Sequence, residues 1–276
     1  MTTDYDKRHH DLLLPVVQVQ TGAGGGSGTV VYSKENDKGE YSTFVLTNHH
    51  VIDSMITIKE EWSPLLGRKV KADVRSQPNV NFFEYRWASR AIGATAVKAD
   101  IVAYDVNEDL ALLKLLTERP VPAVAMLYPR GKEHELRATM PLYAVGAGAG
   151  EPPLITPGML SQFGAMIDNR EFWVSSTPIY FGNSGGALFL ADSHELLGVP
   201  SRMRVSMLGM SADAVTHIAF NIPITRVYGF FDSQMFQFLY DDTHTETGDA
   251  EARKAIRHHD LLEQASKSAE ESLSGS

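Results

Sequence analysis

The sequence contains no cysteine, has fewer basic than acidic residues and lacks any long apolar run. Without thiols, the 276-residue chain can form neither disulfide bonds nor thiolate metal sites. The net charge of −9 argues against nucleic acid or an anionic membrane as a partner, because both require clustered Lys and Arg. No apolar run reaches the length of a membrane span, so no spanning segment is expected.

The first residues also lack the basic, apolar and small-residue regions of a secretory signal peptide. With the absence of cysteine, this favours the cytoplasm as the compartment, and an exported chain whose signal has been removed is the alternative. The composition, 43% hydrophobic and 21% charged, is that of a globular chain with a sizeable core.

Short strand patterns, separated by turn residues, follow one another through most of the chain. Residues 29–33 and 42–47 flank a strong turn signal at 36–39 and predict a hairpin. The continuous apolar run at 110–116 predicts a strand buried on both faces. Helical periodicity is clear only at 226–240. We therefore expect an all-β barrel or sandwich with a C-terminal helix.

The chain is expected to divide into a folded part, 12–240, and an acidic tail. Pro120 and Pro122 mark a link between two halves, at about 12–119 and 120–228, and the helix would follow at about 226–240. The tail, 241–276, has nine acidic and four basic residues, a net of −5, and is expected to be solvated and partly disordered or helical.

Two further segments do not fit the strand and helix patterns described above. Residues 62–91 are interpreted as an inserted hairpin whose aromatic side chains complete the core, and a rim that contacts substrate or a partner is the alternative. The hexapeptide at 8–13 recurs letter for letter at 257–262, and we have no physical account of it.

Glycine-rich loops occur at 21–28 and 146–150. A nucleotide-binding interpretation of these loops fails, because no long helix follows either of them. The segment 201–216, which mixes methionine with glycine and serine, is interpreted as an adaptable loop.

One serine turn has the composition that nucleophilic catalysis requires. Ser184 is preceded by Gly182 and followed by Gly185 and Gly186, which free the backbone for positive-φ conformations. Such a turn can lift a hydroxyl into a cleft and direct peptide N–H groups at a developing oxyanion. A plain glycine-rich loop is the alternative.

A histidine and a carboxylate elsewhere in the chain could activate this hydroxyl. His49 and His50 end a predicted strand; as an isolated pair they would be surface residues, and no third ligand lies at suitable spacing for a metal. Asp109 stands at the mouth of the apolar strand, where a partly buried carboxylate needs a partner such as histidine. The order His, Asp, Ser is that of the chymotrypsin-type arrangement.

Six stretches, in order along the chain, carry a resemblance to a known family: 26–31, 46–52, 109–115, 156–161, 182–188 and 218–223. Together they resemble the landmarks of the HtrA/Deg family of trypsin-like serine proteases. The resemblance implies a chymotrypsin-like double antiparallel β-barrel with six strands in each barrel. It implies no metal and no organic cofactor.

The resemblance also implies roles for individual residues. His50, which precedes Val51, would be the general base, Asp109 would orient it, and Ser184 would attack. The backbone N–H groups of Gly182 and Ser184 would form the oxyanion hole. Pro178 would lie at the floor of the primary specificity pocket with Ile179 beside it, and Ala219 and Asn221 would line its wall. Without a carboxylate there, we expect cleavage after small or medium apolar residues.

The chain departs from the usual pattern of the family in its length. About fifty residues after Pro223 are too few for the PDZ domain that usually follows the protease, so peptide sensing by that module is not expected. The loops at 147–154 and 201–216 resemble the activation loops of the family. A homotrimer is possible by analogy with HtrA relatives.

From the sequence, we therefore expect a serine endopeptidase that acts on proteins or peptides through an acyl-enzyme. The alternative, from another class, is a catalytically silent protease-like scaffold that binds peptides or partner proteins.

Overall fold

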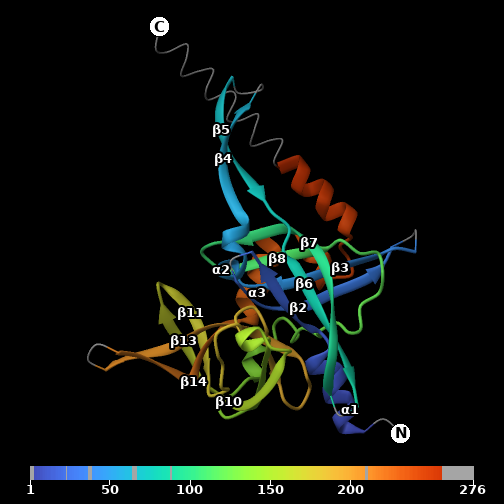
Figure 1. Cartoon of the computed structure of the whole chain (residues 1–276). Helices are drawn as coiled ribbons and strands as arrows, with labels where there is room; N and C mark the ends of the chain where they lie inside the picture. The colour runs from blue at the N-terminus through green and yellow to red at the C-terminus, as the bar shows by residue number, and fades with distance from the viewer. Residues whose placement is uncertain are drawn as a thin grey trace. The chain divides into compact units, whose positions relative to one another are not determined.

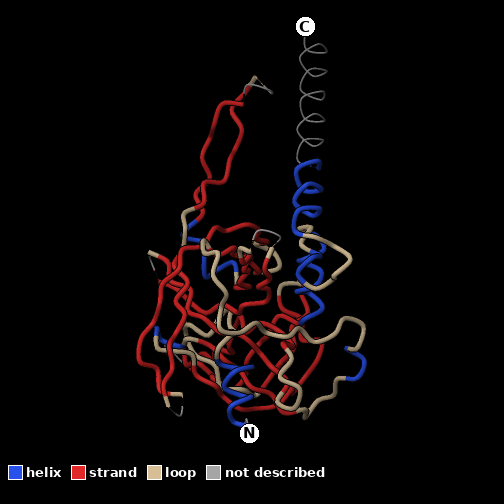
Figure 2. Tube along the Cα trace, turned by 90° about the vertical axis from the view of Figure 1, so that its right-hand side faces the viewer, coloured by secondary structure: helices blue, strands red, loops and turns tan. Residues whose placement is uncertain are grey.

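The computed structural model describes residues 3–22, 24–36, 39–63, 67–87, 89–208 and 211–256. Strands dominate it, and helices are few and short (Figure 2). The chain divides into two compact units. The first comprises Met1–Met55 and Ser76–Phe230, and the second comprises Ile56–Arg75 and Phe231–Ser276.

Barrel one is a closed antiparallel sheet in the first unit, with the strand order β1-β2-β3-β8-β7-β6. It closes where Val19 of β1 pairs with Val80 of β6. All of its strands except β1 are labelled in Figure 1, and their bounds are β1 Val16–Thr21, β2 Gly24–Glu35, β3 Tyr41–Thr47, β6 Asn79–Arg86, β7 Arg90–Asp105 and β8 Leu110–Leu115.

Barrel two lies in the same unit and has the order β10-β11-β14-β13-β12-β9. Pairing of β9 with β10, from Leu154↔Gly146 to Met159↔Pro141, closes it. Its strands run from yellow-green to orange in Figure 1, and their bounds are β9 Pro141–Gly146, β10 Leu154–Ile167, β11 Arg170–Ser175, β12 Ala187–Leu190, β13 Leu196–Leu208 and β14 Ser211–Pro223. The expected double β-barrel is thus confirmed.

The helical elements are short. The α-helices are α1 Asp4–Arg8, α2 His49–Ile52 and α3 Ile224–Ser233. A π-helix, η1, covers His9–Leu13, and single 3-10 turns are η2 Asp53–Met55, η3 Glu133–Glu135, η4 Gly148–Gly150 and η5 Gln237–Leu239. Residues 246–256 are also helical.

Burial in barrel one follows the sequence pattern. Strands β2 and β3 pair as a hairpin, as the turn signal predicted. In β8, Leu110, Leu112 and Leu113 are fully buried, so the prediction of a strand covered on both faces is confirmed. Burying each such side chain contributes about 1.5–3 kcal/mol, which fixes the strand that begins directly after Asp109.

Four predictions about segments need correction. The glycine-rich segment 21–28 is not a loop throughout, because Gly24–Glu35 is strand β2, which pairs with β1 up to Thr21↔Gly24. Residues 62–91 do not form one hairpin: β4 (Ile56–Ser63) pairs with β5 (Arg68–Arg75), whereas the aromatic stretch lies in barrel strand β6. The aromatic side chains do not complete the core either, because Phe82, Phe83 and Tyr85 are half-buried and Trp87 is 77% exposed.

The predicted loop at 201–216 is instead a hairpin of β13 and β14, which pair from Gly198↔Pro223 to Leu208↔Ser211. The C-terminal helix ends at Ser233 rather than at 240, because Met235 takes a left-handed φ of 57° and the Phe236 N–H turns back to the Phe231 carbonyl. The second copy of the repeated hexapeptide, 257–262, lies outside the described residues.

Candidate active site

An imidazole and a carboxylate meet at one end of barrel one. His50 lies on the single turn α2, directly after β3, and Asp109 lies directly before β8. The Nδ1 atom of His50 is 2.9 Å from Oδ2 and 3.0 Å from Oδ1 of Asp109. An ionised carboxylate only accepts hydrogen bonds, so Nδ1 carries the proton and Nε2 is left as a proton acceptor.

Asp109 receives further hydrogen bonds. The backbone N–H of His50 donates to its Oδ1 at 3.1 Å, and the hydroxyl of Ser201, on β13 of barrel two, donates to Oδ2 at 2.7 Å. Burial raises the pKa of Asp109, but the hydrogen bonds from His50 and Ser201 outweigh it and hold this pKa below its ordinary value. The carboxylate is therefore charged at neutral pH and can stabilise an imidazolium.

The backbone around Asp109 is also fixed. Asp109 itself takes a left-handed φ of 54°, a conformation that non-glycine residues adopt at an energetic cost. The buried side chain of Asn48 donates to the Asp109 carbonyl at 2.8 Å and so holds this conformation. As a result, the end of β3 and the start of β8 keep His50 and Asp109 in register.

The Ser184 turn, in barrel two, is shaped by its glycines. Gly182 has a φ of 98°, and a Cβ there would lie 2.6 Å from the Ala147 carbonyl oxygen. Gly185 has a φ of 82°, and a Cβ there would lie 2.3 Å from the Ser27 carbonyl oxygen. Real Cβ atoms do not approach so closely, so both positions require glycine.

The hydroxyl of Ser184 donates to the Ser201 carbonyl at 3.3 Å, a long and therefore weak hydrogen bond. Among the described groups, none accepts the backbone N–H of Gly182 or of Ser184. These two N–H groups are thus available to a ligand.

One cavity of about 540 Å³ brings the reactive groups together. His50, Gly182 and Ser184 all line it, together with Ser201, Arg202 and Met203 of β13. Asp109 lies behind His50 and does not line the cavity. The structure therefore unites the sequence-predicted His50 and Ser184 at one cavity surface, with Asp109 bonded to the far side of the imidazole.

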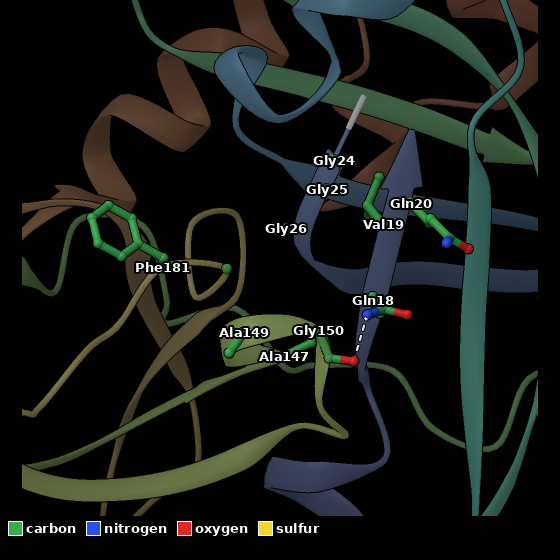
Figure 3. Close-up of a pocket in the computed structure, with 11 residues that line it drawn as sticks. Gln18, Val19, Gln20, Gly24, Gly25, Gly26, Ala147, Ala149, Gly150 and Phe181 are labelled. Carbon is green, nitrogen blue, oxygen red and sulfur yellow. Dashed lines mark hydrogen bonds between the residues drawn. The ribbon is translucent and has the colours of Figure 1, made fainter. Parts of the chain in front are cut away.

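A second cavity, of about 350 Å³, adjoins the first, because Gly24, Gly25, Phe181 and Gly182 line both. Figure 3 shows this second cavity between the glycine run 24–26 of β2 and the loop at 147–150. The side chain of Gln18 donates to the Gly150 carbonyl at 3.0 Å across it. Gly182 thus lies between the two cavities.

The residues predicted for the specificity pocket are separated in the structure. Pro178 and Ile179 line a third cavity, of about 340 Å³, which neither His50 nor Ser184 lines. Ala219 and Asn221 are fully buried on β14 and line none of the three cavities. The Asn221 amide donates to the carbonyls of Trp173 and Ala219, so in this structure it fastens strands β11 and β14.

Ser201 was missed by the sequence analysis, which treated its segment as a loop. A single serine in a strand has no distinguishing pattern, and its contact with Asp109 arises only from the packing of β13 near β8. Within the described ranges, no cluster of three or more His, Cys, Asp or Glu residues could hold a metal ion. None of the described helices is long and apolar enough to cross a membrane.

Two closed six-stranded barrels, with a histidine and a serine at one cavity and an aspartate hydrogen-bonded to the histidine, are the features of the chymotrypsin-like class of hydrolases. The model of the trypsin-like peptidase domain family matches residues 26–199. The chain therefore belongs to the trypsin-like peptidase family. The resemblance found in the sequence is confirmed.

Relatives agree with this assignment. A probable periplasmic serine endoprotease, DegP-like, from Pseudomonas fluorescens is 29% identical over 138 residues, which are 49% of this chain and 27% of that protein. The match thus spans about a quarter of the relative's length.

Two solved structures share the fold. Deg5 is 21% identical with a TM-score of 0.55, over 82% of this chain and 93% of its own. The Rv3671c protease, in an inactive form, is 17% identical with a TM-score of 0.53, over 80% of this chain and 88% of its own. At these identities, both comparisons bear on the fold alone.

Proposed function

We propose that the chain is a serine endopeptidase that cleaves proteins or peptides with His50, Asp109 and Ser184 as its catalytic triad. One observation carries the proposal. The Nδ1 atom of His50 lies 2.9 and 3.0 Å from the two carboxylate oxygens of Asp109, and the same imidazole lines a cavity together with Ser184. A serine hydroxyl is a weak nucleophile until such an oriented base takes its proton.

The mechanism follows from these positions. Ser184 Oγ attacks the carbonyl carbon of the scissile bond as its proton passes to His50 Nε2, and Asp109 stabilises the imidazolium that forms. The N–H groups of Gly182 and Ser184 bind the oxyanion of the tetrahedral intermediate. His50 then gives the proton to the leaving amine, and an acyl-enzyme remains on Ser184. Water, deprotonated by His50, releases the acid and restores the serine.

One rearrangement is needed before attack. In the described part of the chain, no hydrogen bond joins Ser184 Oγ to His50, because the hydroxyl donates to the Ser201 carbonyl instead. The bond to Ser201 is long, at 3.3 Å, and a rotation about the Ser184 side chain is enough to break it. Substrate binding in the cavity is expected to direct the hydroxyl toward the imidazole.

The experiment is labelling with a fluorophosphonate, which reacts with activated serines. Intact-mass and peptide analysis should show one adduct, on Ser184, in the parent protein and none in Ser184→Ala. Casein turnover should be lost in the same variant. A folded parent protein that stays unlabelled at high probe excess, and leaves casein intact, would refute the proposal and favour the silent scaffold.

We further propose a preference for small or medium apolar side chains at the residue whose carbonyl is attacked. Among the described residues that line the cavity beside Ser184, Asp53 is the one carboxylate. Arg202 adds a positive charge to the same cavity, which opposes binding of an Arg or Lys side chain. Digestion of a peptide library should yield cleavage after Val, Ala or Leu. Predominant cleavage after Arg or Lys would contradict this preference.

The name of the DegP-like relative describes it as periplasmic. The cytoplasmic expectation from the sequence therefore finds no support in this comparison. Protein substrates, in contrast, agree with the description of that relative as an endoprotease.

A further inference from the structure

Ser27, on β2 of barrel one, is completely buried, and each of its polar groups has a partner. Its N–H donates to the Ser184 carbonyl at 2.8 Å, and its carbonyl accepts from the Thr47 hydroxyl at 2.7 Å. Its own hydroxyl accepts from the Ala147 N–H at 2.7 Å and donates to the Gly182 carbonyl at 2.6 Å. One side chain of barrel one thus binds two loops of barrel two.

The two bonds of the hydroxyl control both peptide groups that flank Gly182. The peptide after Gly182 is held directly, through its carbonyl. The peptide before it is held through the loop, because the Phe181 carbonyl accepts from the Ala149 N–H at 2.6 Å, and Ala147 anchors that loop to Ser27. Neither peptide can turn over without breaking one of these short hydrogen bonds.

This arrangement sets the direction of the Gly182 N–H. In a trans peptide the N–H points opposite to the C=O, and the structure has no cis peptide among its described residues. Since the Phe181 carbonyl points to the 147–150 loop, the N–H of Gly182 points away from that loop. Gly182 lines the cavity that holds Ser184, where an oxyanion would form.

We propose that Ser27 is a positioning residue for the oxyanion hole. Its hydroxyl keeps the Gly182 peptides and the 147–150 loop in the one arrangement that leaves the Gly182 and Ser184 N–H groups free to bind an oxyanion. Ser27 does not touch the substrate; it acts through Gly182 and Ala147. This inference rests on the proposed function, because an oxyanion hole has a purpose only in acyl transfer.

A second contact supports the same loop from outside. The side-chain amide of Gln18, on β1, donates to the Gly150 carbonyl at 3.0 Å (Figure 3). Its amide oxygen accepts in turn from Asn81 of β6 at 2.8 Å. Because this contact is exposed, it cannot replace the buried bonds of Ser27.

The test is Ser27→Ala, with Thr29→Val as the matched control. Thr29 lies on the same strand, is equally buried and has a hydroxyl without a partner among the described groups, so its variant removes a hydroxyl that holds nothing. Both variants are compared with the parent protein for far-UV circular dichroism, kcat and KM on one peptide substrate, and inhibition by the matching peptide aldehyde. The aldehyde adds to Ser184 and places the resulting oxyanion in the oxyanion hole. Binding of the substrate before reaction, in contrast, does not depend on the oxyanion hole.

We expect Ser27→Ala to lower kcat and to weaken aldehyde binding by the same factor, about 10- to 100-fold, with KM within about threefold of the parent value. Thr29→Val should leave kcat, KM and the affinity for the aldehyde within about twofold of the parent values. A folded Ser27→Ala protein with parent-like kcat and aldehyde affinity would overturn the inference, and so would equal losses in both variants. If Ser27 had a purely structural role, Ser27→Ala would change the stability or KM without equal falls in kcat and aldehyde affinity.

Amide hydrogen exchange in the parent protein tests the same contact without a variant. The Ala147 N–H, bonded to a buried hydroxyl, should exchange at least about 100-fold more slowly than an unprotected amide. Exchange at the unprotected rate would overturn the inference even if Ser27→Ala fails to fold. A parent protein that neither reacts at Ser184 nor cleaves peptides, but protects Ala147, would contradict the proposed function and leave the contact itself established.

Discussion

His50 and Asp109, from barrel one, are held in place by their side chains, whereas Ser184, from barrel two, is held by its backbone. The Asp109 carboxylate accepts hydrogen bonds from the His50 ring, the His50 N–H and the Ser201 hydroxyl. The Ser184 carbonyl is bonded to Ser27, but its hydroxyl makes only a 3.3 Å contact. The proposed general base, His50, is therefore held in one orientation, while the hydroxyl of the proposed nucleophile, Ser184, keeps some rotational freedom.

The difference agrees with what each group has to do in the proposed mechanism. An imidazole that receives a proton must stay in one tautomer and one orientation, which the Asp109 carboxylate enforces. A nucleophile must move toward the carbonyl carbon, so its hydroxyl needs freedom while the surrounding N–H groups stay fixed. Side-chain hydrogen bonds suit the first requirement, and glycines with positive φ suit the second.

The largest expected effect comes from breaking the barrel-one side. Asp109→Asn keeps the shape of the side chain but replaces an acceptor-only carboxylate with an amide that can donate to Nδ1. His50 would then carry its proton on Nε2, the tautomer that cannot accept from Ser184. We expect kcat to fall about 10,000-fold with KM little changed, measured on a peptide substrate. A loss below about tenfold would show that His50 is oriented without the carboxylate.

A smaller effect is expected from breaking the barrel-two side. Gly182→Ala places a Cβ 2.6 Å from the Ala147 carbonyl at a φ of 98°, so the turn must shift and carry its N–H away from the oxyanion. We expect kcat to fall by about 100- to 1,000-fold and affinity for a peptide aldehyde to fall in parallel.

Gly131→Ala serves as the matched control, because Gly131 also has a positive φ, 86°, but its Cβ would meet no atom within 4 Å. That variant should lose some stability and keep its aldehyde affinity. If both variants lose aldehyde affinity equally, the turn at 182–186 has no special part in binding the oxyanion.

The same contrast explains what the sequence could predict. The serine turn was recognisable because positive φ and close backbone approach leave only glycine at 182 and 185. Strand β8 was recognisable because an apolar run next to Asp109 has few places other than a core. Features set by local backbone geometry or by continuous burial thus leave a pattern in the sequence.

Features set by the pairing of distant strands leave no such pattern. Ser201 reaches Asp109 only because β13 passes close to β8, and the composition of 201–216 suggested a loop where β13 and β14 pair. Ala219 and Asn221 were expected at a pocket wall, but pairing of Asn221 with Trp173 turns their side chains into the core. The pairing of distant strands decides such a placement, and a single sequence does not reveal that pairing.

The smallest expected effect concerns the hydrogen bond between Ser201 of barrel two and Asp109 of barrel one. Ser201→Ala removes the hydroxyl that donates to Asp109 at 2.7 Å and leaves the two contacts from His50 in place. Losing a hydrogen bond to a buried carboxylate should lower the free energy of unfolding at pH 7 by about 1.5–3 kcal/mol. The expected fall in kcat is modest, about tenfold or less, because His50 still holds the carboxylate.

The pH dependence of this loss follows from the pKa of Asp109. Its pKa in the folded state lies below the ordinary value of 3.8, so the ionised carboxylate stabilises the folded protein above that pH, and this stabilisation is lost as the pH falls through the folded-state pKa. The difference in unfolding free energy between parent and Ser201→Ala should therefore be constant from about pH 5 to 7 and shrink below about pH 4. Urea unfolding at a series of pH values from 7 down to about 2 measures it. A difference that stays constant over this whole series would mean that Ser201 supports the packing of β13 and not the charge of Asp109, and the barrel-one side would then depend on His50 alone.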